Sequence, residues 1–170
     1  MKNIILLIAI GAILVSCEKE DKTDKIKHAK NIILMIGDGM GVTQVYAAMS
    51  VSEKPLVFEK FKYIGLQKTY SANNYVTDSG ASATALSTGF KTNNESIGVD
   101  TMGKPLKTIL EYAEENQYKT GLVATSTIIH ATPASFIAKD TFRYNYESIA
   151  YDFLNVDIDL FIGGGRKYFT

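Results

Sequence analysis

A serine that leads into a run of small residues is the most informative feature of this sequence. Thr77, Asp78 and Ser79 precede Gly80–Ala85, in which every side chain is small enough for a closely packed helix. The N-terminus of a helix offers free backbone N–H groups and a field that favours an anion. A serine there could attack a phosphoryl group while the backbone steadies the charge. A serine that only caps the helix is the simpler alternative, and this segment alone favours it.

A conventional serine hydrolase is the first rival interpretation of the Asp-Ser-Gly sequence. A Ser-His-Asp mechanism needs a histidine base, and the sequence has two histidines, His28 in a charged stretch and His130. The nucleophile elbow is also absent, because Thr77 stands where that motif requires glycine. A bound metal ion is therefore the better-supported activator of Ser79.

An aspartate between two glycines is the second candidate. Asp38 follows the apolar run Asn31–Ile36 and lies within Gly37–Gly41, so its carboxylate could project from a tight turn toward an ion. Dinucleotide binding fails as an interpretation, because the fingerprint requires glycine at its sixth position and Val42 stands there. An aspartate that only hydrogen-bonds its own turn stays open as an alternative.

Three polar residues in the second half of the chain could join the same site. His130 and Thr132 are separated by one residue, so on an extended segment both could face one ligand, with Pro133 stiffening the loop. Arg143 follows, and a guanidinium can bind two phosphate oxygens at once. Taken singly, the histidine could be structural and the arginine could be an exposed surface residue.

The apolar segments around these residues predict the scaffold. Strands are predicted at Asn31–Ile36, Gly121–Ala124 and Leu160–Ile162, and helices at Val42–Val51, 106–113 and Tyr146–Leu154. Strands that alternate with helices indicate an α/β fold with a parallel sheet. Ligands of such sheets bind beyond the carboxyl ends of the strands, and the candidate residues fall at those ends.

The composition indicates one ordinary domain and excludes some partners. The chain has 170 residues, 46% of them hydrophobic, which suffices for a sizeable core. Its 18 basic and 18 acidic residues cancel. The chain therefore lacks the excess of basic residues that would indicate nucleic-acid binding, and the excess of acidic residues that would indicate a disordered tail.

The first residues predict an exported lipoprotein. The apolar run Ile4–Val15 follows Lys2 and is shorter than the about 20 residues that span a bilayer, but it suits a signal peptide. It ends in Leu-Val-Ser-Cys, which resembles a lipobox whose cysteine, Cys17, takes a diacylglycerol. A buried cysteine at the end of a core helix is disfavoured by the charged stretch that follows, which is typical of a solvated tether.

Taken together, these segments resemble the alkaline phosphatase family. Asn31–Gly41 resembles that family's first strand and metal-binding aspartate, Val76–Ala85 its nucleophile motif, and His130–Ala134 its magnesium-site segment. Arg143 stands where the family places a phosphate-clamping arginine, and Gly163–Phe169 resembles a further strand end. The order and spacing of the motifs together are highly specific.

The resemblance implies a three-layer α/β fold around a mostly parallel sheet, incomplete in this chain. It also implies hydrolysis of phosphate monoesters with two zinc ions and one magnesium ion. Asp38 would bridge one zinc and the magnesium, and Thr132 would contact the magnesium. Ser79, activated by zinc, would form a phosphoserine, while Asp78 would orient Arg143 on the phosphate.

Two positions differ among relatives. The family divides between aspartate and histidine at residue 130, so His130 would hold a magnesium-bound water or bind zinc in that site; we favour the first role. Lys139 stands where many relatives carry histidine, which is a peripheral departure.

The resemblance also predicts the organisation of the chain. We expect a lipoprotein signal peptide at 1–16, a charged tether at 17–30 and the N-terminal part of a catalytic domain at 31–170. The family's other zinc ligands lie beyond Thr170, so we expect a fragment of a longer protein. It would be lipid-anchored in the cell envelope, on the periplasmic or cell-surface side, and a homodimer is a possible assembly.

Two classes of alternative stay open. Related enzymes of the same superfamily include phosphodiesterases, sulfatases and phosphoglycerate mutases, although the Ser79 motif and Arg143 favour a monoesterase. A surface lipoprotein that binds phosphate or metal without turnover is the alternative from a different class.

Overall fold

The computed structural model describes residues 29–170. The predicted signal peptide, the lipidation site Cys17 and most of the predicted tether lie outside the described residues. The chain divides after Ile36, and Gly37–Thr170 forms a unit of its own that holds every helix and strand described below. No helix within 29–170 is long and apolar enough to cross a bilayer.

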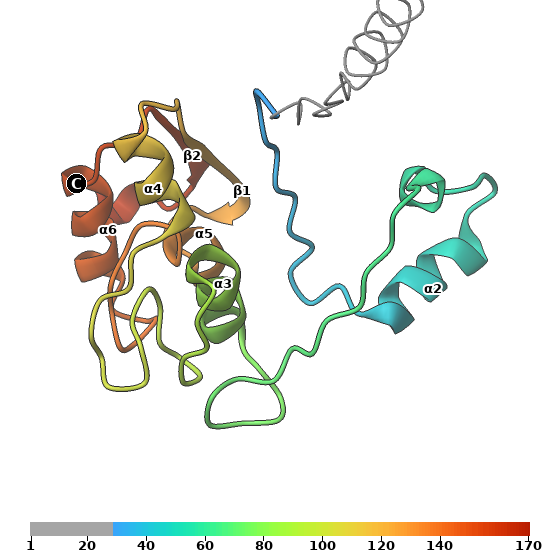
Figure 1. The fold of residues 1–170 in the computed structure, drawn as a ribbon, viewed down its shortest axis with the longest axis horizontal. Helices are drawn as coiled ribbons and strands as arrows, with labels where there is room; N and C mark the ends of the chain where they lie inside the picture. The colour runs from blue at the N-terminus through green and yellow to red at the C-terminus, as the bar shows by residue number, and fades with distance from the viewer. Residues whose placement is uncertain (1–28) are drawn as a thin grey trace, which may run out of the picture. The chain divides into compact units, whose positions relative to one another are not determined.

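Helices and strands alternate along the second half of this unit (Figure 1). In chain order the elements are α2 (Val42–Val51), η1 (Val57–Lys60), α3 (Ser79–Thr88), α4 (Ile109–Glu115), β1 (Gly121–Thr127), α5 (Ala131–Ala134), α6 (Tyr146–Asn155), β2 (Leu160–Gly164) and η2 (Arg166–Tyr168). Two short 3-10 turns, η1 and η2, were not predicted from the sequence.

The sheet of the described chain has two strands, β1 and β2, which run parallel. Gly121 pairs with Leu160 and Val123 with Ile162, and the register shifts before Thr127 meets Gly164. The helix α6 lies between the two strands in sequence, as a parallel pair requires of its crossover. The predicted α/β class with parallel strands is confirmed.

The predicted strand at Asn31–Ile36 is wrong for this structure. These residues have no regular secondary structure, and Ile32 and Met35 are 86% and 88% exposed. A strand is stable only when its backbone groups are hydrogen-bonded to a neighbouring strand. Neither β1 nor β2 pairs with this segment, so its apolar pattern alone does not make it a strand.

The helix predicted at 106–113 starts later than predicted. Thr108 caps α4 and accepts a hydrogen bond from the backbone N–H of Glu111, whose carboxylate accepts in turn from the N–H of Thr108. This capping box fixes the first helical residue as Ile109. Leu106 therefore lies before the helix, although it has the right spacing for its apolar face.

One apolar cluster joins the elements that follow α3. The α4 residue Leu110 and the α6 residues Ile149 and Phe153 pack with Ile128 and Ile129, which form the turn after β1. Because this turn is fully buried, it fixes where the chain leaves β1 and enters α5 (Figure 1). The end of β1 is therefore a rigid platform for the polar residues that come next.

Small side chains let α3 approach its neighbours closely, as predicted, but its main partner is α5. The hydroxyl of Ser87 donates to the carbonyl of Ser135 at 2.6 Å, and Ser135 donates to the carbonyl of Gly80 at 3.3 Å. A Cβ at Gly80 would lie 2.9 Å from the carbonyl oxygen of Ser96. The small-residue run therefore positions the first turn of α3 against α5 and the loop around Ser96.

Candidate active site

Ser79 is the first residue of α3, and Asp78 is the residue that caps the helix. The Asp78 Oδ1 atom accepts from the backbone N–H of Ala81 at 2.9 Å. The alternative in which Ser79 only caps the helix is therefore wrong. The Ser79 hydroxyl instead donates to Asp38 Oδ1 at 3.0 Å, across 41 residues of sequence.

Asp38 accepts one hydroxyl on each of its two carboxylate oxygens. Ser79 donates to Oδ1, and Thr132 donates to Oδ2 at 2.7 Å. These long-range contacts, and not a hydrogen bond to its own turn, hold the Asp38 carboxylate in place. Burial raises the pKa of Asp38, but the hydrogen bonds from Thr132 and Ser79 and the nearby Arg143 guanidinium outweigh it, so the pKa lies below its ordinary value.

Thr132 reaches this site from a short helix, whereas an extended segment was predicted. His130 caps α5, and Thr132 and Pro133 lie inside it. His130 and Thr132, with one residue between them, still meet the same partner, because the backbone of His130, with φ −59° and ψ 147°, is not yet helical. Thr132 Oγ1 bonds Asp38 directly, and His130 Nδ1 lies 3.8 Å from the same carboxylate oxygen.

Arg143 is held by two side chains at once. Its Nη1 donates to Asp78 Oδ2 at 3.0 Å, and its Nη2 lies 3.1 Å from His130 Nε2. The side chains of Arg143 and Asp78 are 12% and 22% exposed, so solvent screens this ion pair less than a surface pair. The guanidinium also lies over the ring of Tyr144, 5.5 Å from its centroid.

The contact with Arg143 selects the tautomer of His130. A guanidinium can only donate, so His130 Nε2 must carry a lone pair and the neutral ring has its proton on Nδ1. That proton faces Asp38, which is the nearer charged acceptor. Nδ1 then cannot also accept from the N–H of Thr132, and that contact, at 3.5 Å, is at the limit of a hydrogen bond.

The six predicted site residues within the described chain thus form one connected network, and the seventh, Cys17, lies outside the described residues. From one end to the other it comprises Ser79, Asp38, Thr132, His130, Arg143 and Asp78. Nucleophile, carboxylate and arginine come from three separate parts of the sequence. The arrangement can present a hydroxyl, an anion-binding helix terminus and a cation to one small anionic group.

Oxygen atoms are the metal donors that this network offers. The oxygens of Asp38, Ser79 and Thr132 converge, and hard cations such as magnesium prefer such donors. Within residues 29–170, no group of three or more His, Cys, Asp and Glu residues lies together in a way that could hold a metal ion. The described residues therefore fit part of a magnesium site but not a whole zinc site.

Two residues that sequence reasoning missed contact the nucleophile segment. Asn94 Oδ1 accepts from the N–H of Asp78 at 3.2 Å, and Asn94 Nδ2 donates to the carbonyl of Val76 at 2.9 Å. The N–H of Glu95 donates to Asp78 Oδ2 at 3.0 Å. The loop of polar residues after α3 gave no signal for these contacts, because their partners lie about 17 residues earlier.

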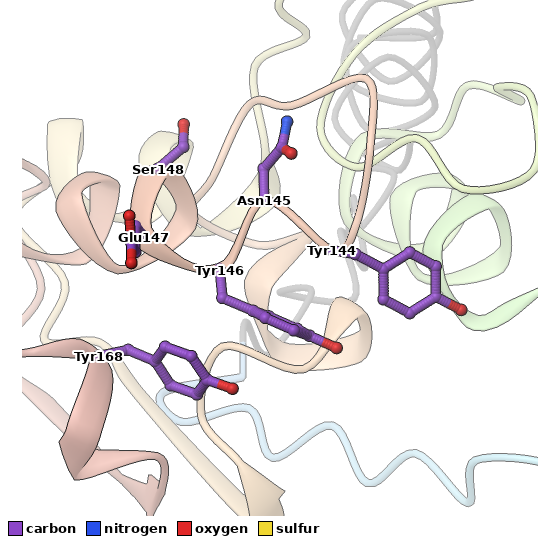
Figure 2. Close-up of a pocket in the computed structure, with 6 residues that line it drawn as sticks. All are labelled: Tyr144, Asn145, Tyr146, Glu147, Ser148 and Tyr168. Atoms are coloured by element: carbon purple, nitrogen blue, oxygen red, sulfur yellow. The ribbon is translucent and has the colours of Figure 1, made fainter.

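A shallow hollow of about 400 Å³ lies beside Arg143 along the chain. Figure 2 shows the rings of Tyr144, Tyr146 and Tyr168 around it, together with Asn145, Glu147 and Ser148. The Tyr146 and Tyr168 ring centroids are 5.1 Å apart, and those of Tyr144 and Tyr146 are 6.1 Å apart. This aromatic surface neighbours the site, although none of its residues belongs to the network.

Comparisons with known proteins agree with the motifs. The alkaline phosphatase family profile matches residues 29–170. Alkaline phosphatase 3 of Bacillus subtilis is 42% identical over 176 residues, which cover 95% of this chain and 38% of that protein. The alkaline phosphatase of Escherichia coli is 39% identical over 173 residues, with 85% and 37% covered. The chain thus spans somewhat over a third of the length of these relatives.

Solved structures give the same result for the fold. The alkaline phosphatase of the Antarctic bacterium TAB5 superposes with a TM-score of 0.76 at 47% identity, covering 78% of this chain and 39% of that one. A histidine-to-aspartate variant of the TAB5 enzyme, with magnesium bound in its M3 site, also superposes with a TM-score of 0.76. The predicted family is confirmed: the chain belongs to the alkaline phosphatase family.

Proposed function

We propose that the complete protein hydrolyses phosphate monoesters through a phosphoserine intermediate on Ser79. One observation carries the proposal. The Ser79 hydroxyl lies at the start of α3, 3.0 Å from Asp38, while Arg143 is tied to the residue next to Ser79. The same hydrogen-bonded network therefore supplies a nucleophile, an anion-binding helix terminus and a phosphate-binding cation.

The phosphoryl group would be bound by N–H donors that other residues leave free. A guanidinium has five N–H donors. Within residues 29–170, Asp78 and His130 take one each, which leaves three on Arg143. Among the described residues, no hydrogen bond engages the backbone N–H groups of Ser79 and Gly80 at the first turn of α3. These donors suit the non-bridging oxygens of a phosphate.

Serine attack would then follow from this placement. The Ser79 Oγ atom would form a bond to phosphorus while the bond to the leaving alcohol oxygen breaks, and that oxygen would leave with a proton. Water would later break the phosphoserine bond and release inorganic phosphate and free Ser79. Arg143 and the α3 terminus would hold the non-bridging oxygens through both steps, which lowers the entropic cost of each.

Two zinc ions and one magnesium ion complete the proposed site. Asp38 and Thr132 would hold the magnesium through hard oxygen donors, and Asp38 and Ser79 would face the zinc ions. When bound, the metals would act as Lewis acids that stabilise the serine oxygen and the leaving oxygen. In this proposal the remaining zinc ligands lie outside the described residues, which hold no complete zinc site.

His130 would link the magnesium site to the arginine. Its position between Asp38 and Arg143 supports a role at the edge of the third metal site, where it would hold a magnesium-bound water. The TAB5 variant, in which an aspartate replaces a histidine and magnesium occupies the M3 site, supports a link between such a histidine and the third metal. A softer imidazole suits magnesium less well than a carboxylate does.

The test is hydrolysis of an aryl phosphate by the complete protein, before and after a chelator removes its metals. We expect activity that the chelator abolishes and that zinc with magnesium restores. An aryl phosphodiester and an aryl sulfate serve as comparison substrates, and both should react far more slowly. Faster turnover of either would favour another enzyme of the superfamily. Phosphate binding without any turnover would favour a binding protein and refute the proposal.

We also propose that the mature protein is anchored in the cell envelope through lipid on Cys17. Support comes from the sequence alone, in the apolar run Ile4–Val15 and the lipobox-like residues that end it. A single acyl chain gives only marginal membrane binding, so stable attachment requires the multiply acylated lipoprotein form.

A further inference from the structure

We propose that Asn94 and Glu95 form a positioning clamp for Ser79 and Arg143, an inference that rests on the proposed function and deepens it. Neither residue touches the reacting atoms. The Asn94 side chain fixes the segment that leads into the nucleophile. The Glu95 backbone ties that same segment to the arginine.

Asn94 grips the chain on both sides of Thr77. Its Oδ1 accepts from the N–H of Asp78 at 3.2 Å, and its Nδ2 donates to the carbonyl of Val76 at 2.9 Å. A side-chain amide has its acceptor and its donor on two different atoms, so it can bond two backbone groups at once. The backbone N–H of Asn94 also donates to Asn73 Oδ1 at 2.9 Å, so the backbone that carries this side chain is itself held in place. The peptide groups before Ser79 are thereby fixed relative to the loop.

Glu95 acts through its backbone and in a strained conformation. Its φ of 72° lies in the left-handed region, which is unfavourable for a residue other than glycine. In this conformation its N–H donates to Asp78 Oδ2 at 3.0 Å, and its carbonyl accepts from the N–H of Arg143 at 2.7 Å. Its side chain is exposed. Strain of this kind persists only where surrounding contacts require it.

Both ends of Arg143 therefore depend on Glu95. The backbone N–H of Arg143 bonds the Glu95 carbonyl, and its guanidinium bonds the same Asp78 oxygen that the Glu95 N–H bonds. A shift of Glu95 would move the arginine and the cap of α3 together. Misplacement by about 1 Å can cost about 10²-fold in rate, so the clamp has leverage on catalysis without contacting substrate.

The first pair of variants separates the clamp from its loop. Asn94→Ala removes both bonds to the nucleophile segment, whereas Asn93→Ala removes one bond to the carbonyl of Thr101, at 3.3 Å. The two residues are adjacent and have the same side chain. We expect Asn94→Ala to lower kcat/KM by about 10- to 100-fold, and Asn93→Ala to change it less than about twofold.

The second pair controls for backbone strain. Glu95→Val and Gln117→Val each put a β-branched residue at a positive φ, 72° or 63°. Gln117 follows α4, and its backbone N–H donates to the carbonyl of Glu114 and not to a network residue. Both variants should lose similar thermal stability, and only Glu95→Val should lose kcat/KM. Glu95→Gly keeps the backbone groups and tolerates a positive φ, so it should retain activity near that of the wild type.

The readout is the inhibition constant for inorganic phosphate together with kcat/KM, measured on the complete metal-loaded protein. In an Arg143→Ala background, Glu95→Val should have much less effect than in the wild type, because Glu95 acts on catalysis through the arginine and its partner Asp78. Full additivity of the two losses would overturn the clamp. So would an Asn94→Ala protein that loses stability but keeps its phosphate inhibition constant. A wild type that neither binds nor turns over phosphate would instead refute the proposed function, and the clamp with it.

Discussion

Replacement of Asp78 by alanine should destabilise the site more than its position at a helix end suggests. The carboxylate makes three separate contacts. Oδ1 caps α3 through the N–H of Ala81, and Oδ2 accepts from the N–H of Glu95 and from Arg143. Loss of a cap costs about 1 kcal/mol, loss of a neutral hydrogen bond about 1 kcal/mol, and loss of a charge-assisted bond about 1.5–3 kcal/mol. The sum is about 3.5 to 5 kcal/mol.

The contact with Arg143 dominates this estimate because both side chains are mostly buried, at 12% and 22% exposure. Asp78→Asn should lose roughly half as much free energy of unfolding. The amide oxygen can still accept on one side, but the NH₂ group faces the N–H donors on the other side and cannot accept from them. Asp100→Ala is the matched control. Asp100 Oδ1 accepts from the N–H groups of Met102 and Lys104 in a loop, without a charged partner. It should cost about 1 to 2 kcal/mol.

Two measurements on the complete protein test this ordering. Urea unfolding at fixed metal concentration gives the loss of global stability. Amide hydrogen exchange of residues 79–88 and 92–98 gives the loss of local stability. We expect Asp78→Ala to raise exchange in both segments, and Asp100→Ala to leave both unchanged. If Asp78→Ala costs no more than Asp100→Ala, or if exchange in 92–98 does not respond, the network we describe does not hold the site together.

Three further predictions address the anchor, the third metal and a structural ion pair. Cys17→Ser should release the protein from membranes or leave its signal peptide uncut; a wild type that is wholly soluble, with a different mature N-terminus, would contradict the anchor. His130→Asp should lessen the dependence of activity on added magnesium, because a carboxylate binds magnesium directly; superimposable magnesium titrations would remove His130 from the metal site. Burial raises the pKa of Glu111, but the bond from Lys139 and other hydrogen bonds outweigh it, so the pKa in the folded protein lies below that in the unfolded chain. Its stabilisation is therefore present above the pKa of the unfolded chain and lost as pH falls through the lowered folded pKa. In that acidic range the urea midpoint of Glu111→Gln should depend less on pH than that of the wild type; an unchanged pH profile would contradict this.

Local patterns in the sequence were sufficient for several elements. The helix Val42–Val51 has the predicted bounds, and α6 ends at Asn155, one residue later than predicted. The placement of Ser79 at the start of α3 was also predictable, because the helix-compatible run of small residues begins directly after it. These features depend on neighbours within a few residues, which periodicity and capping rules describe.

Long-range pairing could not be derived from the residues alone. Asp38 meets Ser79 across 41 residues and Thr132 across 94, and nothing local distinguishes it from an aspartate that serves its own turn. The resemblance to a family supplied that link. It did not supply the direct contact between His130 and Arg143, or the cap of α3 by Asp78.

The apolar run Asn31–Ile36 shows the opposite limit. Its composition is typical of a buried strand, yet its residues are exposed and unpaired with β1 or β2. Strand propensity describes how a segment fits a sheet that already exists. Lys139 illustrates a similar point, because the sequence suggested a peripheral role. In the structure its ammonium bonds Glu111 and the carbonyl of Leu106, and so ties the start of α4 to the following loop.

The most direct test of the central claim is chemical identification of the phosphorylated residue. The complete, metal-loaded protein is incubated briefly with labelled inorganic phosphate at acidic pH, where the covalent intermediate should accumulate, and is then digested and analysed by mass spectrometry. Our account predicts label on Ser79, and none in a Ser79→Ala variant that still folds. Label on any other residue, or turnover by Ser79→Ala at the wild-type rate, would contradict it.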